Sequence, residues 1–203
     1  MAPPRIIDPS GTYHVNSIGN FGGDVYVTAF DCVAFLELYA RVARKQGWVT
    51  YAYCLMTNHF HVVVRLVDGG LSDGMRELNG CYSRRMNAIA GRTGRGHLFK
   101  NRFHAVHIET DAHLLESCRY VVNNPVTAGM CAHPKEWRWS SYNASAGACS
   151  PPPFLAVDEL LGLFRNDRER ARTAYCAFVS DGLARWSDQR KEIVRSDETA
   201  VAG

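Results

Sequence analysis

Two histidines stand two residues apart in the segment His59-Phe60-His61, which continues into a run of valines. Strand side chains alternate between faces, so His59 and His61 are expected on one face while Phe60 points into the core. Two imidazoles about 7 Å apart along a strand can together bind one divalent cation. A pair of surface histidines on a half-exposed strand is the alternative, and the isolated pattern favours that alternative.

A second candidate lies on a helix that is predicted just before Pro125. Glu116, Tyr120 and Asn124 recur every four residues, which places a carboxylate, a phenol and a carboxamide on one helix face. A phenol is a poor general base at neutral pH, but it can act as a nucleophile where a metal ion polarises the electrophile. The alternative is that Tyr120, one of nine tyrosines, only packs.

These residues must be positioned by elements that the hydrophobic pattern predicts. Apolar residues at steps of three and four predict helices, whereas alternating or β-branched runs predict strands. Asp31 and Asp111 are the predicted N-caps, and Pro125 is expected to end the last helix because proline disfavours helical geometry at the preceding residue. The strands are expected at 13–18, 49–56, 59–67 and 103–109, and the helices at 32–46, 71–89 and 112–122.

The order strand, helix, strand, strand, helix, strand matches the split βαβ plan. The predicted fold class is α+β, a ferredoxin-like antiparallel sheet with helices on one face, plus a short helical C-terminal extension. We assign residues 1–145 to the main domain and 151–187 to the extension, with helices at 157–164 and 169–183. Residues 188–203 are a charged tail with the composition of a disordered segment.

The charge of the chain is unevenly distributed. Seven basic residues and one acid, Glu77, lie between Arg76 and Arg102, a net charge of +6 in this stretch against +3 for the whole chain. Such a cluster is typical of a surface that binds nucleic acid, with a solvated helix face as the alternative. The candidate DNA contacts are Arg76, Arg84, Arg85, Arg92, Arg95, His97, Lys100 and Arg102.

Composition narrows the class of protein further. With 203 residues, of which 46% are hydrophobic, the chain can bury a core without disulfides. No apolar run reaches the roughly 20 residues of a membrane span, and the N-terminus lacks the apolar stretch of a signal peptide. The seven cysteines include no CxxC pair, as expected of reduced thiols. We therefore expect a cytoplasmic protein with no membrane partner.

Several stretches, taken together, resemble the single-tyrosine HUH transposases, which include small insertion-sequence transposases and REP-associated tyrosine transposases. The resemblance covers residues 5–145 in order. Its stretches are 13–15 (Tyr-His-Val), 52–64 around the histidine pair, 96–103 (Gly-His-Leu-Phe-Lys-Asn-Arg-Phe), 114–129 around Tyr120, and 139–142 (Trp-Ser-Ser-Tyr).

The resemblance implies a role for each candidate residue. By position, His59 and His61 would be metal ligands, Tyr120 the nucleophile and Asn124, one helical turn later, the third ligand. The implied cofactor is Mg²⁺ or Mn²⁺. The implied activity is that of an endonuclease and strand transferase, which cuts single-stranded DNA beside a hairpin through a 5′-phosphotyrosine link. The partner would be a REP-like hairpin or an insertion-sequence end, in a bacterial nucleoid.

Alternatives to this function remain open. A domesticated protein that binds hairpin DNA with little cleavage is one, although it need not keep His59, His61, Tyr120 and Asn124. A replication initiator or relaxase with the same chemistry is another, which the Asn-Pro-Val-Thr-Ala-Gly context after Val122 disfavours. The resemblance leaves both a monomer and a homodimer open.

One departure from the family concerns the segment 17–20, Ser-Ile-Gly-Asn, where relatives commonly have an arginine before Gly-Asn. The DNA contact of that arginine is therefore not expected here. Unstacked bases of a single strand bind aromatic side chains. Candidates for such stacking are Phe99, Phe103 and Tyr82, of which Phe103 and Tyr82 also lie in phase with the core.

Overall fold

A four-stranded antiparallel sheet in the order β2-β3-β1-β4 forms the centre of the molecule. The computed structural model describes residues 7–91 and 96–201, with side chains as far as residue 184. The strands are β1 (Thr12–Ile18), β2 (Val49–Leu55), β3 (His59–Arg65) and β4 (His104–Ile108). The ferredoxin-like prediction is confirmed, and each strand agrees with its predicted position to within two residues.

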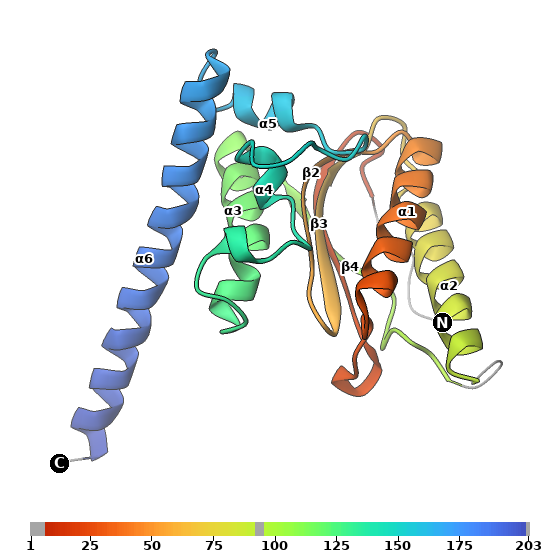
Figure 1. Cartoon of the computed structure of the whole chain (residues 1–203), viewed down its shortest axis with the longest axis horizontal. Helices are drawn as coiled ribbons and strands as arrows, with labels where there is room; N and C mark the ends of the chain where they lie inside the picture. Colours follow the sequence, from red (N-terminus) through yellow and green to blue (C-terminus); the bar gives the residue numbers. More distant parts are fainter. Residues whose placement is uncertain (1–6, 92–95, 202–203) are drawn as a thin grey trace.

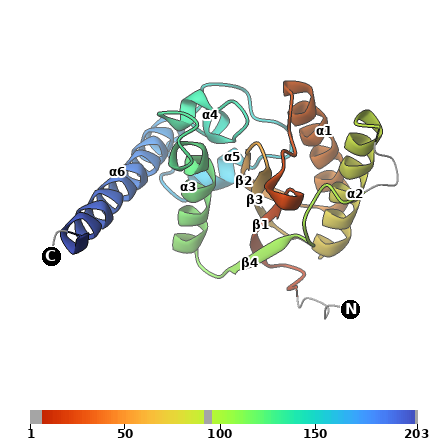
Figure 2. The same ribbon diagram turned by 90° about the horizontal axis from the view of Figure 1, so that it is seen from below.

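Two layers of helices sandwich this sheet. Helices α1 and α2 cover one face, as the split βαβ plan predicts, while α3 covers the other face (Figures 1 and 2). Phe60 packs against Phe35 of α1, with 4.8 Å between ring centroids, so the main core lies between the sheet and this helix pair. The three helices are α1 (Ala29–Gln46), α2 (Leu71–Ile89) and α3 (Asp111–Thr127).

The N-terminal caps of α1 and α3 differ from the prediction by a few residues. Thr28, and not Asp31, is the N-cap of α1, and Asp31 closes a capping box from the third helical position. Thr110, and not Asp111, is the N-cap of α3. In both helices a threonine hydroxyl accepts the backbone N–H three residues later, which leaves the aspartate in the first turn, where its charge favours the helix dipole.

Pro125 does not end α3, which corrects the prediction from sequence. The helix continues to Thr127, and the buried Pro125 lies in its last turn, where its missing N–H costs the helix one backbone hydrogen bond, to the Val121 carbonyl. The carbonyls of Asn124 and Pro125 accept the backbone N–H groups of Ala128 and Met130, at 2.9 and 2.8 Å. Asn124 therefore stays on the helix, one turn beyond Tyr120.

The C-terminal part packs against the α3 side of the sheet (Figure 1). Short elements η2 (Pro134–Glu136) and α4 (Tyr142–Ser145) lead to α5 (Val157–Gly162) and the long α6 (Arg168–Val201). Helix α6 passes residue 188, where the charged tail was expected to begin, and the division into domains stays a prediction. No helix in the part of the chain that the structure describes is long and apolar enough to cross a membrane.

Candidate functional site

The histidine pair of β3 faces α3, on the side of the sheet opposite to Phe60. The His59 and His61 rings lie 4.9 Å apart between centroids. His61 is only 5% exposed, whereas His59 is half-buried and contacts the Asn58 carboxamide oxygen through Nδ1 at 2.7 Å. The alternation of the strand thus places both imidazoles on one face, as the sequence predicts.

Helix α3 brings Tyr120 to this pair. The Tyr120 ring meets the His61 ring edge-on, with 5.6 Å between centroids, while 54% of the tyrosine stays exposed. Asn124 donates from Nδ2 to the Tyr120 carbonyl at 3.1 Å, which leaves its side-chain oxygen as the polar atom for another ligand. Glu116 instead forms an ion pair with Arg119, so its carboxylate already has a partner.

The structure adds His14, which sequence reasoning left without a role. His14 lies on β1, the neighbour of β3, and its Nε2 is 2.8 Å from Nδ1 of His61. Its ring also meets the Tyr120 ring edge-on at 5.6 Å. The signal was present in the sequence, because a ferredoxin-like sheet pairs these strands and alternation puts residue 14 on the histidine face.

Burial keeps these imidazoles neutral at physiological pH. Desolvation, with a smaller effect of neighbouring histidines, lowers the pKa of His61 to about 2 and the pKa of His14 to about 4. Burial also lowers the pKa of His59. A neutral imidazole carries one N–H and one lone pair, so each ring can donate one hydrogen bond and ligate one cation.

The residues present fit a divalent cation. Nε2 of His61 is buried and has no hydrogen-bond partner, although its Nδ1 contacts His14. An unsatisfied buried polar atom costs about 1–3 kcal/mol, which a bound cation would offset. Among the described residues, no group of three or more His, Cys, Asp or Glu is arranged to hold a metal ion by itself. The candidate set is instead two imidazoles and the Asn124 carboxamide, a weak set for Mg²⁺ or Mn²⁺ until a phosphate oxygen joins it.

His14 should orient His61 for this role, since a metal-bound imidazole normally gives its other N–H to a fixed partner. We expect His14→Phe to weaken Mn²⁺ binding by about 10- to 100-fold. Titration of free Mn²⁺ by electron paramagnetic resonance measures this directly. His104→Phe on β4 is the matched control and should bind Mn²⁺ like the wild type. Equal affinity in both variants would exclude an orienting role for His14.

Helix α6 holds the other side of α3. Asn123, which is buried, donates from Nδ2 to the Val179 carbonyl at 3.0 Å. The Arg119 guanidinium lies over the Phe178 ring, 4.4 Å from its centroid. Arg119 directly precedes Tyr120, and Asn123 directly precedes Asn124. The contacts with α6 therefore fix the rotation of α3 about its axis.

Loss of this anchor should lower stability. We expect Asn123→Ala to reduce the free energy of unfolding by about 1–3 kcal/mol, because a buried hydrogen bond and its packing are lost. Urea unfolding measures the change. Asn143→Ala is the control, since Asn143 makes a similar bond to the Lys135 carbonyl, 3.0 Å long, at an exposed position. That variant should change stability by less than about 0.5 kcal/mol, and equal losses in both would contradict the anchoring.

A groove of about 820 Å³ lies between α2 and the segment that precedes β4. Five of the predicted DNA contacts line it: Arg76, Arg84, His97, Lys100 and Arg102. Arg85 is exposed on α2 but does not line the groove, while Arg92 and Arg95 lie outside the described residues.

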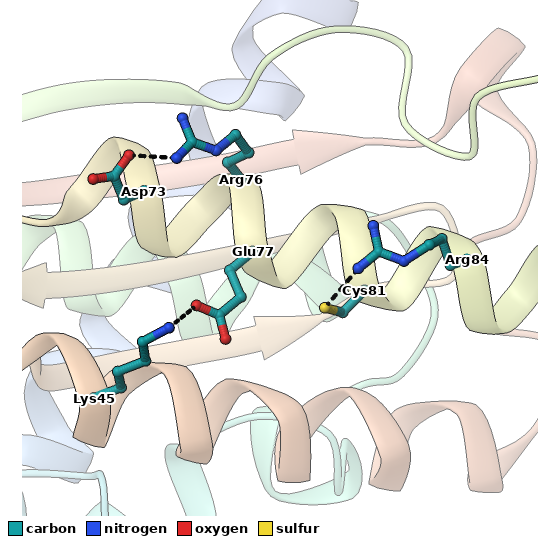
Figure 3. Close-up of polar contacts among 6 residues, drawn as sticks. All are labelled: Lys45, Asp73, Arg76, Glu77, Cys81 and Arg84. Atoms are coloured by element: carbon teal, nitrogen blue, oxygen red, sulfur yellow. Dashed lines mark hydrogen bonds and ion pairs between the residues drawn. The ribbon is translucent and has the colours of Figure 1, made fainter.

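The acid within the basic stretch is turned away from the groove. Glu77 forms an ion pair with Lys45 of α1 at 2.6 Å, on a different side of α2 from Arg76 (Figure 3). Arg76 pairs with Asp73 at 2.8 Å, but both side chains are largely exposed and such pairs contribute little. Arg84 lies 3.0 Å from the Cys81 sulfur. The groove wall formed by α2 therefore keeps a positive charge.

Comparison with known proteins points to a transposase family. The profile of the IS200-like transposase family matches residues 25–124, a span that includes both histidines, Tyr120 and Asn124. No curated protein matches the sequence significantly.

Two solved structures match this chain to different degrees. A REP-associated tyrosine transposase bound to a REP hairpin has a TM-score of 0.61 and 18% identity, over 77% of this chain and 91% of that one. A candidate transposase from Deinococcus radiodurans R1 has a TM-score of 0.41 and 17% identity, over 61% of this chain and 97% of that one. The profile match shows that the chain belongs to the IS200-like transposase family, and the first structure shares its fold.

Proposed function

We propose that this protein is a metal-dependent endonuclease and strand transferase that acts on single-stranded DNA beside a hairpin. The observation that carries the proposal is the approach of the exposed Tyr120 ring, within one chain, to the ring of His61, whose buried Nε2 has no hydrogen-bond partner. A structurally similar transposase was solved with a REP hairpin, which supports hairpin DNA as the ligand.

The proposed mechanism assigns one task to each group. Bound Mg²⁺ or Mn²⁺, held by His59, His61 and Asn124, would supply Lewis-acid polarisation of a phosphate oxygen. The Tyr120 oxygen attacks phosphorus in line, and the bond from phosphorus to the 3′-oxygen breaks. The phenol proton passes through solvent to the departing 3′-oxygen. The products are a 5′-phosphotyrosine link and a free 3′-OH, and attack by a second 3′-OH reverses the step and joins strands.

The test is a covalent-adduct gel with hairpin oligonucleotides from the flanks of the gene. Each oligonucleotide is labelled at its 5′ or 3′ end and mixed with the protein in Mn²⁺ or EDTA. We expect a slower band that needs Mn²⁺ and carries only the DNA downstream of the cut. Tight binding without an adduct, across several flanking hairpins and both Mn²⁺ and Mg²⁺, would favour the hairpin-binding alternative.

The basic groove is proposed to hold DNA phosphates. Each lost phosphate contact should lower the slope of log K against log salt by about 0.7 to 0.9. We therefore expect Arg84→Ala to weaken binding and flatten this slope, while the neighbouring Arg85→Ala changes both less because Arg85 does not line the groove. Fluorescence anisotropy over a series of salt concentrations measures both. A larger effect of Arg85→Ala would place the DNA elsewhere on α2.

A further inference from the structure

The structure buries all three aromatic residues considered for stacking on DNA bases, which confirms the core positions of Tyr82 and Phe103 and makes Phe99 wrong as a stacking candidate. Tyr82, Phe99 and Phe103 belong to the hydrophobic core. Tyr82 also donates its hydroxyl to the Val25 carbonyl at 3.1 Å, inside the protein. Phe99 and Phe103 line the groove, but each is only 7% exposed, and Tyr82 is fully buried. These rings leave too little open surface for a base to stack on, so single-stranded DNA would need another aromatic surface.

Phe21 is such a surface. It is 97% exposed, in the short turn η1 (Asn20–Gly22) that follows β1. Its φ of 54° lies in the left-handed region, and no other non-glycine residue of the described chain has a positive φ. A bulky side chain in that region is strained by the order of 1–3 kcal/mol, and such strain clusters at functional sites. Neither burial nor backbone preference therefore explains a phenylalanine here.

The turn is fixed between the histidine pair and the basic groove, the two parts of the proposed DNA-binding surface. On one side, the Gly19 N–H donates to the Asn58 carbonyl at 2.7 Å, directly before His59. The Asn58 carboxamide closes the same contact by donating to the Gly22 carbonyl at 3.2 Å. A side chain at Gly19 would clash with the Gly23 carbonyl, so this tight approach requires glycine.

On its other side, the turn is tied to the wall of the basic groove. The Asn20 N–H donates to the Leu98 carbonyl at 2.8 Å, and the Lys100 N–H donates to the Ile18 carbonyl at 2.9 Å. Leu98 and Lys100 both line the groove. The exposed ring thus sits on a turn held by hydrogen bonds at both ends, between phosphate-binding cations and the histidine pair.

We propose that Phe21 is a stacking platform for one unstacked base of the DNA strand that runs from the basic groove to the histidine pair. The proposal rests on the proposed function, because it needs a single strand along this path. Aromatic rings bind single strands in this way, beside cations that hold the backbone, with little preference for sequence. Phe21 would thereby fix how far the strand advances before its scissile phosphate reaches Tyr120.

The experiment measures binding of the full chain to a fluorescein-labelled hairpin with a single-stranded thymidine tail, in EDTA. Loss of one stacked base weakens such binding by about 5- to 150-fold. We expect this loss for Phe21→Gly, with an unchanged salt slope and a raised midpoint of thermal unfolding, since glycine relieves the positive φ. Phe21→Trp should restore binding. Phe30→Ala, which removes another exposed phenylalanine (83% exposed), should bind like the wild type.

Abasic sites in the tail identify the base. At one tail position, removal of the base should weaken binding to the wild type and leave binding to Phe21→Gly unchanged. Wild-type affinity in Phe21→Gly, or an equal loss in Phe30→Ala, would overturn the stacking role while Arg84→Ala still reports phosphate binding. Absence of salt-dependent binding by the wild type would instead contradict the proposed function itself.

Discussion

Replacement of Tyr120 by phenylalanine should abolish the covalent adduct and lower DNA cleavage by at least about 10³-fold, because it removes the attacking oxygen. The ring itself remains, with its edge-on contacts to His14 and His61. The side chain is largely exposed, so the free energy of unfolding should change by less than about 0.5 kcal/mol. Quantitative adduct gels with matched binding curves measure the two effects separately.

Tyr26→Phe is the matched control for this substitution. The Tyr26 hydroxyl is buried without a partner in the core between the sheet and α1. Its removal should leave cleavage at the wild-type level. If Tyr120→Phe kept metal-dependent cleavage at a comparable rate, the nucleophile would be water or another side chain, and the tyrosine mechanism would be wrong.

Replacement of His61 by alanine should have the second largest effect. It removes the buried imidazole whose Nε2 has no partner in the protein, and with it a direct metal ligand. Even outer residues that orient a ligand change metal affinity by about 10- to 100-fold, so loss of a ligand should cost at least the upper value. Cleavage at a fixed, limiting Mn²⁺ concentration should fall in parallel.

Thermal unfolding with and without Mn²⁺ measures the His61 effect without any catalytic step. A ligand that binds only the folded state raises its stability by RT ln(1 + [L]/Kd), so wild-type protein should gain melting temperature as Mn²⁺ increases. His61→Ala should show no such gain. His113→Ala, at an exposed position in the first turn of α3, is the control and should retain it. A full Mn²⁺ shift in His61→Ala would place the metal elsewhere.

Local patterns predicted the strands, the helices and the meeting of His61 with Tyr120 well. Alternation and helical periodicity depend only on neighbouring residues, so they can be seen in the sequence. The expected faces of His61 and Tyr120 meet across β3 and α3 in the structure. The predicted end of α3 was wrong, because the burial of Pro125 outweighs the tendency of proline to end a helix. Periodicity placed Tyr82 and Phe103 in phase with the core, whereas the burial of Phe99 follows from tertiary packing.

Contacts between distant segments were the part that sequence reasoning missed. The partnership of His14 with His61 needs the pairing of β1 with β3, which follows from the ferredoxin-like plan and not from local patterns. The same holds for Phe21, whose setting depends on hydrogen bonds to residues near 58 and 98. The groove likewise selects Arg84 over its neighbour Arg85, a choice that the charge count could not make.

The site is assembled from a single chain. Both histidines, His14 and the helix that bears Tyr120 come together without a second copy, and α6 of the same chain holds that helix through Asn123. One chain therefore brings the histidine pair and the candidate nucleophile side by side.

Mass spectrometry of the trapped adduct tests the central claim most directly. The protein is incubated with Mn²⁺ and a hairpin oligonucleotide, then digested with nuclease and trypsin. We predict that the peptide 120–135 carries a nucleotide mass on Tyr120, joined through a 5′-phosphate, and that EDTA removes this product. A nucleotide on another residue, or metal-dependent cleavage with no nucleotide on any peptide, would contradict the tyrosine mechanism.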